Sequence, residues 1–99
     1  MPFGSFRKGG QMARIVRGGL IQCANPVNDE TRPVSEIQQA ALEAHLPFIE
    51  EAGKQKVQLL CLQEIFNGPY FCPSKDVRWY DATESVPGPT TETMQALAK

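Results

Sequence analysis

Residues 57–72, Val-Gln-Leu-Leu-Cys-Leu-Gln-Glu-Ile-Phe-Asn-Gly-Pro-Tyr-Phe-Cys, are the stretch that decides the fold of this 99-residue chain. The first six are almost all apolar, which predicts a strand buried on both faces, as in a parallel sheet. The rest combine one carboxylate with aromatic residues, glycine and proline, which predicts a long loop. A buried strand that ends at a carboxylate is therefore expected near the middle of the chain.

A helix is predicted upstream, because apolar residues recur there at spacings of three and four. They are Val34, Ile37, Ala41, Ala44, Phe48 and Ala52. The same spacing continues through Pro47, so a kink is expected and not two separate helices.

The ends of this helix have candidate capping residues. Ser35 followed by Gln38 is one possible capping box, and Thr31 is a rival N-cap. Gly53 is expected just past the last helical residue, where a left-handed conformation is common.

An earlier strand is predicted over residues 15–22, which are rich in Ile, Val and Leu. Gly18 and Gly19 weaken it, and glycine inside a strand often marks the close approach of another backbone or a ligand. Strand, helix and strand together predict a βαβ unit of an α/β fold.

Beyond the second strand the chain is loop-rich to residue 89, with a helical turn expected over residues 75–80. Thr90 or Thr91 is then expected to cap a helix that runs to Lys99. Residues 1–12 are expected to form a flexible arm, and residues 13–99 an incomplete domain.

Composition excludes several classes of function. The formal net charge is -1. The sequence lacks the basic stripe with interleaved aromatic residues that is typical of nucleic-acid-binding proteins. No apolar run reaches the roughly 18 residues that predict a membrane span. The three cysteines are odd in number and widely spaced, so they do not indicate a disulfide framework. Cys23 and Cys61 are expected to be reduced core residues of a cytoplasmic protein.

Glu64 is the first candidate for chemistry. Ligands of open α/β sheets bind beyond the carboxyl ends of the strands, and Glu64 lies two residues past Leu62. A carboxylate placed there is expected to be partly desolvated, which makes it a better proton acceptor near neutral pH. A surface or helix-capping glutamate is the alternative interpretation.

Most of the chain's aromatic residues follow Glu64 within a short window. Apolar walls with a few polar groups are typical of small-molecule pockets. A satellite core beneath a long loop is the alternative. The residues concerned are Phe66, Tyr70, Phe71, Trp79 and Tyr80, with Asn67 among them.

The segment 60–72, together with Gly19-Leu-Ile-Gln22, resembles the nitrilase superfamily of carbon–nitrogen hydrolases. Within it the chain looks most like the branch that contains β-ureidopropionase and N-carbamoylputrescine amidase. Residues 78–81, Arg-Trp-Tyr-Asp, and 87–91, Pro-Gly-Pro-Thr-Thr, also fit that branch. The resemblance extends over residues 15–99.

This resemblance implies an αββα sandwich, of which the chain would be the N-terminal part, and a Glu-Lys-Cys triad. Glu64 matches the family's general base, while the lysine and the nucleophilic cysteine come further downstream in the family. Phe66, Asn67, Tyr70 and Phe71 are expected in the substrate pocket. No metal or organic cofactor is implied.

Local alternatives to this triad are weak. Cys72 lies in a loop and not in the family's nucleophile setting, and Cys61, Cys72 and His45 match no zinc-ligand spacing. His45 is expected to be a solvated or hydrogen-bonded helix residue.

The leading hypothesis is therefore a parent enzyme that hydrolyses an N-carbamoyl amine or amino acid, a small-molecule substrate. Another amidase or nitrilase of the superfamily, or an inert fragment, are the alternatives. The 99-residue piece is expected to be inactive alone, with a sheet face left uncovered, and the parent is expected to be a homo-oligomer.

Overall fold

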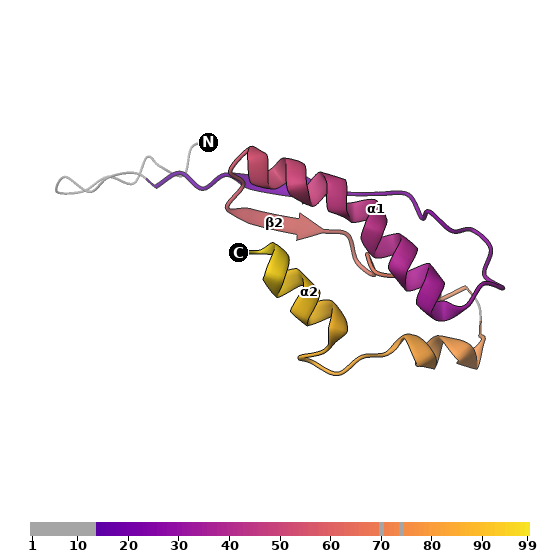
Figure 1. Ribbon diagram of the computed structural model, residues 1–99. Helices are drawn as coiled ribbons and strands as arrows, with labels where there is room; N and C mark the ends of the chain where they lie inside the picture. The colour runs from indigo at the N-terminus through magenta and orange to yellow at the C-terminus, as the bar shows by residue number, and fades with distance from the viewer. Residues whose placement is uncertain (1–13, 70, 74) are drawn as a thin grey trace.

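The computed structural model describes residues 14–69, 71–73 and 75–99, so the arm predicted over residues 1–12 lies outside the described residues. A strand, a helix and a second strand are followed by two further helices, which confirms the α/β fold (Figure 1). The elements are β1 (Gly18–Ile21), α1 (Val34–Lys54), β2 (Leu59–Leu62), the 3-10 helix η2 (Val77–Ala82) and α2 (Pro89–Leu97).

The two strands pair in parallel, in a register that joins Gly18 to Leu59 and Ile21 to Leu62. Parallel neighbours need a long crossover, and α1 supplies it. This confirms the βαβ unit and places β1 and β2 side by side beneath α1 (Figure 1). Both strands are shorter than the predicted ranges of 15–22 and 57–62.

Burial of the sheet differs from the prediction. Leu20 on β1 is 87% exposed, Leu59 on β2 is 68% exposed, and Cys61 is also exposed. Alternate side chains of a strand point to opposite faces, so these three residues share the face turned away from α1. The expectations of a strand buried on both faces and of Cys61 in the core are therefore wrong, because the described residues cover one face and leave the other to solvent. The separate expectation that a sheet face of this piece is left uncovered is confirmed by the same exposures.

The core lies along the first two-thirds of α1. Ile37, Ala41 and His45 are buried at intervals of four residues, whereas Phe48 is 55% exposed. Phe48 lies on the same side of the helix as Ile37, since eleven residues make just over three full turns. The predicted spacing is thus helical as expected, and Phe48 stays exposed on the apolar face because η2 packs near the N-terminal half of α1.

Helix α1 begins without a side-chain cap. Pro33 occupies the N-cap position, Ser35 lies inside the helix, and Thr31 donates from its hydroxyl and its N–H to the Asp29 carboxylate, at 2.5 and 3.0 Å. The hydroxyl bond, followed by the backbone bond, holds the pKa of the exposed Asp29 below its usual value. Both predicted N-caps are wrong, because Pro33 is the N-cap residue and Thr31 bonds within the preceding turn instead.

Helix α2 also begins without the predicted cap. Gly88 is its N-cap and Pro89 its first residue, which suits a position where no backbone N–H is needed. The Thr93 hydroxyl donates to the Pro89 carbonyl within the first turns. Capping by Thr90 or Thr91 is therefore wrong, and the helix ends at Leu97. In Figure 1, α2 lies on the side of β2 opposite to α1.

Helix α1 continues through both Pro47 and Gly53 as one element. It ends in a Schellman motif, in which the Val57 N–H donates to the Ala52 carbonyl and the Lys56 N–H to the Gly53 carbonyl, both at 3.0 Å. The left-handed position of this motif is Lys56, with φ 58°. The expectation that Gly53 lies past the helix is therefore wrong: the glycine comes three residues before the place that needs it. The kink at Pro47 stays a prediction.

A glycine at position 56 and an alanine at position 53 are each expected to stabilise the protein. Lys56→Gly removes the Cβ penalty of a left-handed residue, and Gly53→Ala removes glycine from a helical position where the new Cβ meets nothing within 4 Å. Each change is expected to raise the free energy of unfolding by about 0.5–1 kcal/mol. Urea unfolding followed by circular dichroism measures this. Lys54→Gly, in the last turn of the helix, is the matched control and should destabilise.

Candidate functional site

Glu64 begins a turn just past the carboxyl end of β2. The turn covers residues 64–67, and the Gly68 N–H donates to the Ile65 carbonyl at 3.4 Å. This is the edge at which open α/β sheets bind ligands, as predicted. Glu64 is exposed, however, so the expected partial desolvation of its carboxylate is not found in the described chain.

The residue after Glu64 has an unusual backbone. Ile65 lies in the left-handed region, with φ 53°. A β-branched residue rarely adopts this conformation, which costs on the order of 1–3 kcal/mol and is most often found at functional sites. The turn that carries Glu64 is therefore specified by its surroundings and not by the local preference of Ile65.

Gln63, the residue before Glu64, holds the end of β1. Its side-chain amide accepts a hydrogen bond from the Cys23 N–H at 2.5 Å and donates one to the Cys23 carbonyl at 2.8 Å. We call this pair of bonds the Gln63 clasp. No local sequence pattern predicts these two bonds, because the contact depends on the register of β1 against β2.

Phe66 packs against α1. Its ring meets the His45 ring edge-to-face, with centroids 5.6 Å apart and an interplanar angle of 76°. Nδ1 of His45 lies 2.7 Å from the Ala41 carbonyl and therefore carries the proton. Nε2 is buried and has no hydrogen-bond partner among the described residues. The expectation that His45 is hydrogen-bonded is thus confirmed. The alternative, a solvated His45, is wrong, because the residue is 2% exposed.

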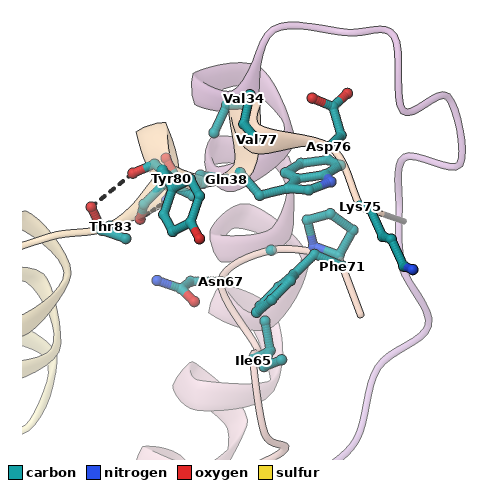
Figure 2. A pocket seen from close by; sticks show the side chains of 14 residues that line it. Val34, Gln38, Ile65, Asn67, Phe71, Lys75, Asp76, Val77, Tyr80 and Thr83 are labelled. Carbon is teal, nitrogen blue, oxygen red and sulfur yellow. Dashed lines mark hydrogen bonds between the residues drawn. The ribbon is translucent and has the colours of Figure 1, made fainter. Parts of the chain in front are cut away.

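A cavity of about 550 Å³ lies between the loop that follows Glu64, η2 and the start of α1. Figure 2 shows Ile65, Asn67 and Phe71 of that loop opposite side chains of η2. Its volume lies within the range of about 300–1,000 Å³ that is typical of small-molecule sites. Its lining residues are Val34, Gln38, Ile65, Asn67, Gly68, Pro69, Phe71, Lys75, Asp76, Val77, Trp79, Tyr80, Ala82 and Thr83.

The predicted pocket residues divide between two places. Asn67 and Phe71 line this cavity, whereas Phe66 packs on His45 and does not line it. Tyr70 lies outside the described residues. Glu64 does not line the cavity either, but the adjoining Ile65 does. The cavity therefore begins one residue beyond the candidate base.

Hydrogen bonds and packing hold the wall that η2 contributes. The Gln38 amide on α1 donates to the Ala82 carbonyl at 3.1 Å, and Trp79 is buried. The Arg78 guanidinium lies 4.5 Å from the centre of the Trp79 ring. On the opposite wall, the Asn67 amide donates to the Thr90 hydroxyl at 3.3 Å, which ties the loop to the start of α2. Helical spacing alone did not identify Gln38 as an interface residue.

Cysteine and metal chemistry have few candidates in this chain. Cys23, Cys61 and Cys72 are all free thiols. Across the described ranges, no cluster of three or more His, Cys, Asp or Glu side chains forms a candidate metal site. No described helix combines the length and apolar content needed to cross a membrane.

Comparisons with known proteins show the family of this chain. The carbon–nitrogen hydrolase family model matches residues 19–99. A β-ureidopropionase from Arabidopsis thaliana is 36% identical over 86 residues, which cover 87% of this chain and 21% of that protein. The chain thus spans about a fifth of the length of this relative. No solved structure matches the chain. Because the family model covers most of its residues, the chain belongs to the carbon–nitrogen hydrolase family of the nitrilase superfamily.

Proposed function

We propose that this chain is the N-terminal part of an enzyme that hydrolyses an N-carbamoyl amine or amino acid, with Glu64 as the general base. The observation that carries the proposal is the place of Glu64, in a constrained turn at the carboxyl end of a parallel strand. The 36% identity to a β-ureidopropionase supports the substrate class.

In this proposal the base, lysine and nucleophile come from different parts of a longer polypeptide. Glu64 accepts the proton of a cysteine thiol that lies beyond this chain, and the thiolate attacks the carbamoyl carbon. A lysine, also beyond this chain, stabilises the negative charge that develops on the carbamoyl oxygen. Overall, one water is consumed, and one molecule each of carbon dioxide, ammonia and the free amine is released.

The cavity beyond Ile65 is proposed to hold the part of the substrate that does not react. Its walls are largely apolar, and Asn67, Gln38 and Thr83 add hydrogen-bonding groups. Phe71 and Tyr70 are proposed to complete it from the loop. We also propose that the complete enzyme is cytoplasmic and assembles as a homo-oligomer.

The test is ammonia release by the complete enzyme from two substrates, N-carbamoyl-β-alanine and N-carbamoylputrescine. N-carbamoyl-β-alanine is expected to be hydrolysed with the higher kcat/KM, since the matched relative is a β-ureidopropionase. Equal rates would show that this substrate class is too narrow. Activity on simple amides or nitriles alone would point to another branch of the superfamily. A reading frame that closes at Lys99 would contradict the enzyme proposal for this polypeptide.

A further inference from the structure

The Gln63 clasp extends the pairing of the two strands beyond its last backbone pair. That pair joins Ile21 to Leu62. One residue past the end of β2, the Gln63 side chain takes the place of backbone and bonds both the N–H and the carbonyl of Cys23. Because the amide uses its acceptor and its donor on one residue, turning it over would set donor against donor. The clasp thus fixes the orientation of the Gln63 side chain.

Glu64 depends on its backbone for its position. Among the described residues its carboxylate has no hydrogen-bond or ion-pair partner. Its direction is therefore set by the chain on either side: the Gln63 clasp before it, and the left-handed Ile65 with Phe66 packed on His45 after it. A base that lacks contacts of its own is displaced as soon as its main chain moves.

We propose that Gln63 is a positioning residue, which places the Glu64 carboxylate for proton transfer by anchoring the main chain to Cys23, two residues past the end of β1. This inference rests on the function proposed above. A misplacement of about 1 Å at a reacting group can lower the rate by about a hundredfold. Loss of the clasp should therefore reduce kcat and have little effect on substrate affinity.

The chain offers a matched control at the other end of the same strand pair. The Gln58 side chain accepts a hydrogen bond from the Arg17 N–H at 3.0 Å, across the start of β1 and β2. Gln58 and Gln63 thus have the same side chain and the same kind of cross-strand contact. Gln63 adjoins Glu64, whereas Gln58 lies at the opposite end of β2.

The experiment compares Gln63→Ala, Gln63→Glu, Gln58→Ala and Glu64→Gln in the complete enzyme. Gln63→Ala is expected to lower kcat by about 10- to 100-fold with KM changed less than about threefold. Gln63→Glu keeps the acceptor for the Cys23 N–H and loses the donor, so its kcat should be intermediate. Gln58→Ala should keep kcat within about twofold of the unchanged enzyme, because it lies outside the site. Hydrogen exchange at the Cys23 amide should accelerate in Gln63→Ala alone.

The other outcomes contradict either the positioning role of Gln63 or the proposed function. Full kcat in Gln63→Ala with an inactive Glu64→Gln overturns the positioning role and leaves the proposed function intact. Equal losses in Gln63→Ala and Gln58→Ala show a general structural role and also overturn it. Activity retained in Glu64→Gln overturns the proposed function itself, and the positioning role with it. If Gln63→Ala does not fold, Gln63→Glu is judged by the same kcat and KM criteria.

Discussion

Glu64→Gln is expected to lower kcat of the complete enzyme by about 10²- to 10⁴-fold, the usual contribution of a general base. The amide keeps the shape of the carboxylate but cannot accept the thiol proton. The substitution should leave the fold unchanged, because Glu64 is exposed and its carboxylate has no partner among the described residues. Steady-state ammonia release measures kcat, and far-UV circular dichroism checks the fold.

The matched control is Glu84→Gln. Glu84 is also an exposed glutamate in a loop, but it lies between η2 and α2 and not at the end of a strand. Its substitution removes the same charge and should leave kcat unchanged. If Glu64→Gln keeps more than a few per cent of the activity, Glu64 is not the base. An equal loss in both variants would show that net charge, and not proton transfer, is responsible.

The elements of the fold could be predicted from the sequence because each depends on a local pattern. The apolar run at residues 57–62 located β2, and the spacing of apolar residues from Val34 to Ala52 located α1 within two residues at both ends. Burial could not be predicted in the same way. Phe48 and Leu59 belong to apolar patterns but are exposed, because the pattern shows which face is apolar and not whether another segment covers it.

The candidate site was predicted in part, for the same reason. The strand end before Glu64 is a local feature, so its place at the sheet edge was correctly expected. The Gln63 clasp and the buried His45 depend on contacts between residues 21 to 40 positions apart in the chain, as between Phe66 and His45 or Gln63 and Cys23. Composition and spacing do not encode such contacts. The prediction of Thr31 as N-cap was wrong for another reason. The Thr31 hydroxyl has two possible partners, and the turn at Asp29 competes with the helix for it.

Trp79→Ala is expected to be the most destabilising substitution in the described chain, with a loss of about 3–5 kcal/mol in the free energy of unfolding. Trp79 is 9% exposed and is the one buried residue of η2. Its ring also carries the Arg78 guanidinium at 4.5 Å, so truncation removes the apolar contacts and a cation–π interaction together. A small domain has a total stability of about 5–15 kcal/mol, so this loss would take up much of it.

The neighbouring Tyr80 tests whether burial is the cause. Tyr80 belongs to the same 3-10 helix and is also aromatic, but it is 75% exposed. Tyr80→Ala should therefore cost less than about 1 kcal/mol, as expected of a surface substitution. Urea unfolding must be followed by circular dichroism, because Trp79 is the single tryptophan and its fluorescence disappears with it. Similar losses in both variants would mean that the burial of Trp79 is not the cause of the loss. A large loss confined to Trp79→Ala would show that one side chain maintains the wall of the cavity opposite Phe71 and Asn67, and substrate affinity should then fall along with stability.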